Sequence, residues 1–283
     1  MPELPEVEVL ARHLHPLLRG KTIHGVNIRR TKVLAPTSPQ GFRRTLLGAK
    51  FTGLLRRGKY LLFQLNGKAG GQGLNLLGHL GMTGRMFLAH KQQTLPRHAA
   101  VVLDLGRENF IYEDTRYFGR LTLDISATGK LGPEPLSRNF QPATFARALK
   151  RSRQAIKVKL LDQTLVAGIG NIYASEVLFR ARISPKRAAN RLAPGQVKRL
   201  WRAIREVLAE AIRCGSTVPL NFGGSKSDGL FYFGRAPEAP DFYEERLQVY
   251  DREGQPCLNC RRSIRRMTQA ARSTFYCPHC QRG

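Results

Sequence analysis

Acidic residues are scarce in this chain of 283 residues. Lysine and arginine together number 47 and aspartate and glutamate number 20, so the formal net charge is +27. A charge of this size indicates a polyanionic partner, with DNA or RNA first and an anionic membrane surface second. A basic protein without a specific partner is the alternative that charge alone leaves open.

Long hydrophobic runs are also missing. No apolar stretch approaches the ~18–20 residues of a membrane span. The first residues, MPELPE, are acidic and prolyl, unlike a secretory signal. We therefore expect a cytoplasmic or nucleoid-associated protein without a membrane partner. The apolar fraction of 42% and the charged fraction of 24% are ordinary for a globular protein and argue against disorder in most of the chain.

Cysteine is limited to five residues, which do not suit a disulfide framework in a chain of this length. Four of them, Cys257, Cys260, Cys277 and Cys280, form two C-x2-C pairs separated by sixteen residues, the spacing of a zinc ribbon. Four thiolates leave no open position on the metal, so we predict one structural Zn²⁺. Cys214 stands alone and is expected to be a packed thiol.

Hydrophobic periodicity changes along the chain and indicates an α+β protein with several domains. Apolar residues recur at helical spacing over residues 4–18, where Gly20 ends the helix and Pro16 is expected to bend or shorten it. Residues 22–125 alternate in short runs separated by turn signals, which predicts an antiparallel β-sandwich behind that one helix. Helical spacing returns after a linker expected at residues 126–137.

Two further patterns suit nucleic-acid chemistry. Gly168 and Gly170 lie between helical segments, where backbone N–H groups at a helix N-terminus could hold a phosphate. Pro2 would present a secondary amine after removal of the initiator methionine, and this amine could attack a sugar C1′. Glu3 and Glu6 lie within one turn and could move the proton. The alternative is that these prolines and glutamates only start and stabilise the first helix.

Several motifs then occur in the order typical of one family, and they are PELPEVE from residue 2, RGKY from 57, HLGMTG from 79, YEDTRYFG from 112, GIGNIYASE from 168 and the four cysteines. Through them the chain resembles the bacterial formamidopyrimidine-DNA glycosylases of the Fpg/Nei family. The resemblance implies a catalytic β-sandwich domain at 1–130, a helix–two-turn–helix domain with a lesion-capping loop at 131–240 and a zinc finger at 241–283. It also implies a monomer with damaged double-stranded DNA bound between the lobes.

The resemblance implies removal of oxidised purines, such as 8-oxoguanine and formamidopyrimidines, followed by β,δ-elimination at the abasic site. Pro2 would be the Schiff-base nucleophile and Glu3 the proton donor or shuttle at the sugar. Glu6 would support the site, and Lys59 would contact phosphate and assist catalysis.

The same resemblance implies a set of DNA contacts. Met82, Arg116 and Phe118 would fill the gap left by the flipped nucleotide, with Arg116 reading the orphan cytosine. Ordinary core packing is the alternative for Met82 and Phe118. Backbone phosphates would be held by His79, Lys157, Asn171, Tyr173 and Arg272.

The chain departs from the family pattern at three places. Asp251 and Arg261 stand where family members often have glycine, and the segment 216–240 differs from the usual capping loop, which bears on lesion preference. Three alternative functions follow: a Nei-like glycosylase for oxidised pyrimidines, an inactive lesion-binding protein that retains Met1, and a basic zinc-ribbon RNA-binding protein.

Overall fold

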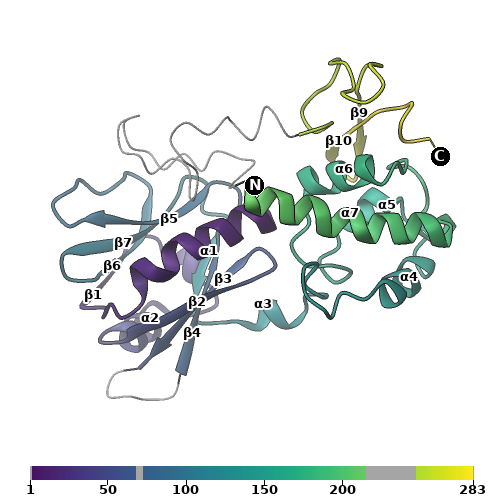
Figure 1. The fold of residues 1–283 in the computed structure, drawn as a ribbon. Helices are drawn as coiled ribbons and strands as arrows, with labels where there is room; N and C mark the ends of the chain where they lie inside the picture. Colours follow the sequence, from purple (N-terminus) through teal and green to yellow (C-terminus); the bar gives the residue numbers. More distant parts are fainter. Residues whose placement is uncertain (1, 68–72, 215–246, 283) are drawn as a thin grey trace. The chain divides into compact units, whose positions relative to one another are not determined.

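The computed structural model describes residues 2–67, 73–214 and 247–282 of the chain. The chain divides into two compact units, whose elements are labelled in Figure 1. Among the described residues, the first unit holds Pro2 and Glu6–Gly129, and the second holds Glu3–Pro5, residues 130–214 and residues 247–282. The short segment Glu3–Pro5 thus belongs with the second unit, although its neighbours on both sides belong with the first.

The helix expected near the N-terminus is α1 (Leu4–Leu18). It ends before Gly20, whose φ of +86° is a conformation that glycine adopts without steric cost, as predicted. Pro16 lies inside the helix, which continues to Leu18. The expected shortening is therefore wrong: only two residues follow Pro16, so the hydrogen bond that proline cannot donate costs the helix little of its length.

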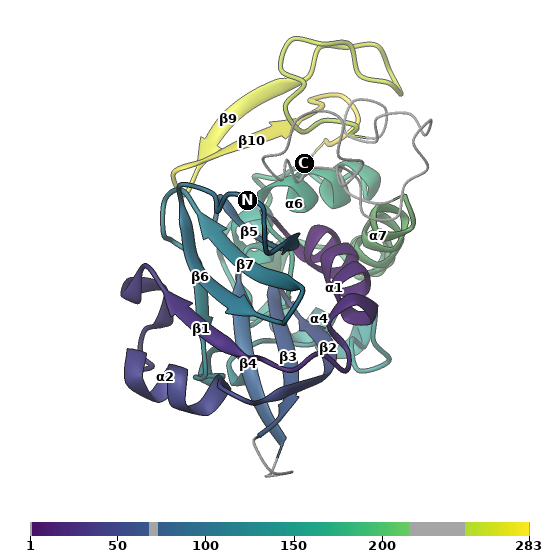
Figure 2. The ribbon, with the colours of Figure 1, turned by 90° about the vertical axis from the view of Figure 1, so that its left-hand side faces the viewer.

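The first unit contains the predicted β-sandwich, made of two four-stranded antiparallel sheets (Figure 2). One sheet has the order β1 (Gly25–Ile28), β6 (Ala99–Asp104), β7 (Glu108–Asp114), β5 (Gly84–His90). The other has the order β2 (Lys50–Arg57), β3 (Tyr60–Asn66), β4 (Gly73–His79), β8 (Arg120–Thr122). Their inner faces share one apolar core, in which the rings of Phe63 and Phe110 pack edge to face with centroids 5.4 Å apart.

The expectation of a single helix before the linker is wrong. The first unit also contains the 3-10 helix η1 (Thr31–Leu34) and α2 (Pro39–Leu46), and the short α3 (Ser126–Gly129) occupies the start of the expected linker. In α2 the Ser38 side chain caps the helix by accepting the Gly41 N–H at 3.1 Å. Phe42 and Leu46, four residues apart, are its two buried residues. Two apolar positions are too few to establish a helical period in the sequence.

The second unit contains the predicted helices and a C-terminal hairpin. In chain order they are α4 (Pro142–Lys150), α5 (Ile156–Leu160), α6 (Asn171–Arg180), the 3-10 helix η3 (Ala189–Arg191), α7 (Pro194–Arg213), β9 (Arg265–Gln269) and β10 (Arg272–Tyr276). The expected capping loop at 216–240 lies outside the described residues. Within the described ranges, every helix is too short or too polar to cross a membrane.

Candidate functional site

The carboxylate of Glu3 is bound at the N-terminus of α6. Its two oxygens accept the backbone N–H groups of Gly170 at 2.7 Å, Ile172 at 2.8 Å and Tyr173 at 3.3 Å. The side chain is 1% exposed. The unpaired N–H groups and the partial positive charge at this end of α6 balance the charge of a buried carboxylate. Pro2 precedes Glu3 by one peptide bond and is also buried, so the binding of Glu3 restricts where the Pro2 nitrogen can lie.

This arrangement corrects the expected phosphate clamp at the Gly-x-Gly turn. The N–H of Gly170 donates to Glu3 and that of Gly168 donates to Gln163 Oε1 at 2.8 Å, so neither is left for a phosphate. Gly168 has a φ of +91°, and a Cβ there would lie 2.6 Å from the Cβ of Leu4. The glycine is therefore needed so that the N-terminal segment can approach the turn.

Two loops of the first unit display the predicted wedge residues. Met82, between β4 and β5, is 46% exposed, and Phe118, between β7 and β8, is 51% exposed. These exposures rule out the core-packing alternative. The Arg116 guanidinium lies 4.7 Å from the centroid of the Phe118 ring. The loops are in close contact, because a Cβ on Gly81 would lie only 2.5 Å from the backbone nitrogen of Gly119.

Asp114 organises both loops, and sequence reasoning assigned it no role. Its fully buried carboxylate accepts Thr83 Oγ1–H at 2.6 Å from the first loop. From the second loop it accepts the N–H groups of Arg116 at 3.1 Å and Gly119 at 2.8 Å. A signal was present, since Asp114 ends a mostly buried strand just before a turn, where an aspartate commonly accepts loop N–H groups.

Lys59 and His79 also belong to the first unit. Lys59 is 8% exposed and follows Gly58, which has a φ of +58° in the turn between β2 and β3. Burial, and then the charges of Lys59 and Arg120, lower the pKa of His79 to about 4. The ring is therefore neutral near pH 7. The Gly81 N–H donates to its Nδ1 at 3.2 Å, so the ring proton is assigned to Nε2, which can donate to a phosphate oxygen.

Lys157 is completely buried. A side chain that binds a DNA phosphate directly would be expected to be exposed. Its Nζ donates to Asn171 Oδ1, to the Ser273 carbonyl oxygen at 2.9 Å and to Thr274 Oγ1 at 2.8 Å. Burial, and then the charge of Arg272, lower its pKa to about 8. The three N–H donors of the ammonium are thus matched by three protein acceptors, which link α5 to α6 and to β10.

The other three predicted DNA contacts of the second unit are Asn171, Tyr173 and Arg272. Asn171 is half-buried. Asn171, the first residue of α6, also donates Nδ2–H to the Ser273 carbonyl oxygen at 2.9 Å. Tyr173 is 1% exposed, whereas Arg272 is exposed at the start of β10. Arg272 directly follows a turn in which Ala270 and Ala271 both have positive φ, which is the turn type of a tight hairpin.

Glu176 connects α6 to the segment that leads into the cysteine hairpin, and it too was missed in the sequence. Its buried carboxylate accepts the N–H groups of Gln248 at 2.9 Å, Val249 at 3.0 Å and Tyr250 at 2.9 Å. Burial raises the pKa of Glu176, and these N–H groups act in the opposite direction. A glutamate directly before the apolar run Val177–Phe179 of this helix was the available signal.

The four predicted cysteines converge at the end of the second unit. Their Sγ atoms all lie within 4.8 Å of one another, with Cys257 and Cys277 buried. Cys257 Sγ is 3.9 Å from Cys280 Sγ, and Cys260 Sγ is 3.4 Å from Cys277 Sγ. Bonds of about 2.3 Å to a tetrahedral zinc place sulfur atoms roughly 3.8 Å apart. The cluster fits one structural Zn²⁺.

Comparisons with known proteins agree with this arrangement. Residues 1–121 match the N-terminal domain of formamidopyrimidine-DNA glycosylase, residues 131–220 its H2TH domain and residues 254–283 a zinc finger found in FPG and IleRS. Formamidopyrimidine-DNA glycosylase of Carboxydothermus hydrogenoformans is 38% identical, with 100% of each chain covered. That of Thermus thermophilus is 43% identical, with 99% of this chain and 98% of the relative covered.

Solved structures extend the comparison. A Lactococcus lactis FPG mutant in complex with a Fapy-dG containing DNA is 32% identical and has a TM-score of 0.86, with 100% of each chain covered. The sandwich, the helical unit and the cysteine hairpin thus define a DNA glycosylase of the zinc-finger class. Within this class, the chain belongs to the formamidopyrimidine-DNA glycosylase family.

Proposed function

We propose that this chain is a bifunctional base-excision-repair enzyme, a DNA glycosylase and abasic-site lyase that removes oxidised purines from double-stranded DNA. The observation that carries the proposal is the binding of Glu3 to the N-terminus of α6, directly beside Pro2. This holds a carboxylate next to a residue whose nitrogen becomes a secondary amine once Met1 is removed. An amine nucleophile and a proton-transfer group therefore lie side by side in the chain.

The chemistry begins when the Pro2 nitrogen attacks C1′ of the damaged nucleotide. The nitrogen loses its proton, the glycosidic bond breaks, and the base leaves after it takes up a proton. Opening of the sugar ring gives an iminium ion, whose positive charge acidifies the C2′ proton. Loss of this proton expels the 3′ phosphate, and a second elimination expels the 5′ phosphate. Glu3 carries protons at the sugar, with Glu6 and Lys59 supporting the site.

The wedge loops serve the step that exposes the nucleotide. A base must leave the stack before its glycosidic bond can be reached. Met82 and Phe118 are exposed apolar side chains that can take its place, and Arg116 beside Phe118 can donate hydrogen bonds to the orphan cytosine. His79, Lys157, Asn171, Tyr173 and Arg272 complete the proposed phosphate contacts, in which Lys157 can take part by orienting Asn171 and the hairpin.

Oxidised pyrimidines are a second candidate substrate class. The observation in their favour is a Lactococcus lactis FPG solved in complex with an oxidized pyrimidine containing DNA, which is 32% identical to this chain. We infer that purine lesions come first, because the motifs with Leu4, Met82 and Phe118 resemble the Fpg branch. The bacterial relatives and the charge of +27 support chromosomal DNA in the nucleoid as the partner. A monomer is proposed from the family resemblance alone.

Borohydride trapping tests the proposal. The protein is incubated with a duplex that carries 8-oxoguanine opposite cytosine and with a second duplex that carries thymine glycol, and the iminium ion is reduced. We expect a covalent complex on the first duplex in larger yield, with mass spectrometry placing the adduct on Pro2. A larger yield on thymine glycol would favour the pyrimidine class. No adduct on either, with Met1 confirmed removed, would reject the enzyme in favour of a lesion-binding protein.

A further inference from the structure

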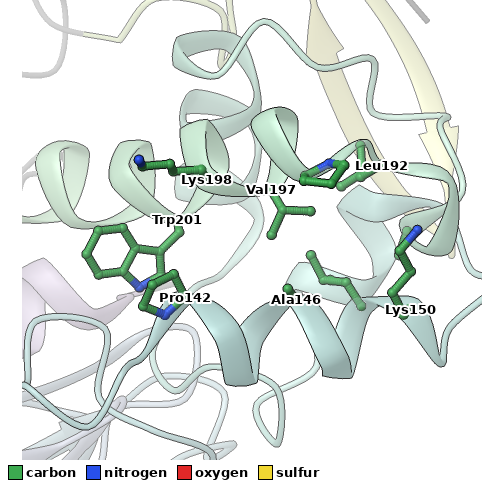
Figure 3. A pocket seen from close by; sticks show the side chains of 10 residues that line it. Pro142, Ala146, Lys150, Leu192, Val197, Lys198 and Trp201 are labelled. Atoms are coloured by element: carbon green, nitrogen blue, oxygen red, sulfur yellow. The ribbon is translucent and has the colours of Figure 1, made fainter.

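An apolar pocket opens on the second unit, among residues to which the proposed function gives no role. It is formed by α4, by the segment that contains η3 and by the first two turns of α7 (Figure 3). Its volume is about 230 Å³. Eight of its ten lining residues are apolar, and the other two are Lys150 and Lys198. Figure 3 shows Trp201 and Pro142 together at one end and Lys150 at the other.

The walls of the pocket are held in place by their own contacts. The Trp201 Nε1–H donates to the Phe140 carbonyl oxygen at 2.9 Å, and its ring stacks on the Phe140 ring with centroids 6.2 Å apart. The Arg205 guanidinium lies 5.3 Å from the Trp201 ring. Val197 and Leu192, which complete the wall, are buried. The pocket is therefore preformed, and a ligand would not have to order it.

The size and chemistry of the pocket restrict its occupant. Pockets for cofactors and drug-sized ligands hold roughly 300–1,000 Å³, so this one suits one or two bulky apolar side chains. Its two polar lining residues are both cationic. In α4 there is no acidic residue, and in α7 the first is Glu206, beyond the pocket. The N-terminal end of α7, at Pro194, adds partial positive charge to the same rim.

We infer that this pocket is a docking site for an acidic segment of a partner protein that inserts one or two bulky apolar side chains. A DNA backbone has no apolar group to fill the walls, whereas apolar anchors flanked by aspartate or glutamate match both the walls and the rim. None of the lining residues is among those proposed for catalysis and DNA binding.

Selection from random 12-residue peptides displayed on phage, with the full-length zinc-loaded protein as bait, tests this inference. The rim is reversed in the double variant Lys150→Glu and Lys198→Glu. The matched control makes the same charge change at exposed lysines outside the pocket, Lys32→Glu and Lys130→Glu. We expect enriched peptides to combine bulky apolar residues with acidic ones. Their affinity should fall at least tenfold in the rim variant and stay within twofold in the control.

Trp201 gives a direct readout of occupancy, because it is the single tryptophan of the chain. Binding of a selected peptide that lacks tryptophan should shift the fluorescence emission of Trp201 to shorter wavelength. The variant Ala146→Gln, which adds bulk to the pocket, should remove both the shift and the binding. The inference is overturned if no peptide is enriched, if both double variants bind equally well, or if undamaged duplex displaces the peptide. Borohydride trapping should remain normal in every variant, which keeps this test independent of the proposed enzyme activity.

Discussion

The backbone N–H of Ile172 donates to a carboxylate oxygen of Glu3 over 2.8 Å, which joins residues 169 positions apart in the chain. Helix N-termini are ready-made anion sites. In this protein the anion comes from the polypeptide, and the helix holds the side chain that we propose carries protons at the sugar. The same bond explains why Gly168 cannot carry a side chain, because the segment around Leu4 has to reach the turn before α6.

Replacing Glu3 by glutamine is expected to stop catalysis while DNA binding survives. The amide keeps one acceptor oxygen, but it cannot carry protons at the sugar and its NH2 group faces N–H donors. Borohydride trapping on 8-oxoguanine duplex should fall at least 100-fold, with affinity for the duplex changed less than threefold. Glu8→Gln, the same change at a glutamate within α1 that pairs with Arg12 and Arg56, should leave trapping intact. Equal losses of binding and trapping in a folded Glu3 variant would contradict the catalytic role.

Replacing Asp114 by asparagine is expected to loosen the loops that carry Met82 and Phe118. One carboxylate oxygen becomes an NH2 group, which cannot accept hydrogen bonds from the buried donors around it. The free energy of unfolding should fall by about 1–3 kcal/mol. The calorimetric Tm should drop, and the affinity for lesion duplex should fall more than the affinity for undamaged duplex. Asp124→Asn is the control, because Asp124 caps the exposed Ser126 turn. If the control lowers Tm equally, Asp114 has no special place in holding the loops.

The elements that sequence predicted best are those whose signal is local. The period of α1 and its end at Gly20, and the spacing of the four cysteines, depend on residues close together in the chain. The helix α2 was missed because only Phe42 and Leu46 are buried in it.

The candidate site was harder to predict, because its geometry depends on contacts between distant residues. The Gly-x-Gly turn was correctly located, but nothing near it in the sequence indicates that Glu3 occupies its N–H groups. The same applies to Lys157, whose burial results from acceptors at Ser273 and Thr274, more than 100 positions further along. Local patterns therefore located the residues, and packing decided which groups they contact.

The neutral state of His79 predicts a pH dependence of stability. The pKa of this ring is about 4 in the folded protein and about 6.5 in an unfolded chain. Between these values unfolding takes up a proton, so stability should fall as the pH drops from 6.5 to 4 and change little above 6.5. The Tm of His79→Gln should fall less over this window than that of the unaltered protein. His90→Gln, at an exposed histidine, should follow the unaltered protein. Parallel curves for all three would show that His79 is not the group responsible.

Zinc removal is expected to unfold the cysteine hairpin and weaken DNA binding. The hairpin places Arg272, and its small core includes Cys257 and Cys277 themselves, so the metal supplies much of its stability. Metal analysis should find one zinc per chain, and a strong chelator should lower affinity for duplex DNA at least tenfold. Cys257→Ser should bind less than one zinc per chain, whereas Cys214→Ser should keep one. Full DNA affinity after complete zinc removal would contradict the structural role.

Arg261 has a φ of +65°, a region where a side chain costs about 1–2 kcal/mol. This is the position at which the family often has glycine, and Asp251, the other such position, has a φ of +59°. Both residues thus carry a side chain in a conformation that glycine adopts without steric cost. Arg261→Gly should stabilise the protein by about 0.5–1 kcal/mol, since the greater freedom of glycine in the unfolded chain offsets part of the relief. Arg262→Gly removes the same charge at a residue without a positive φ and should destabilise. Calorimetry of the zinc-loaded variants measures whether Arg261→Gly raises the Tm and Arg262→Gly lowers it. A lower Tm in both variants would show that the backbone at Arg261 is not strained.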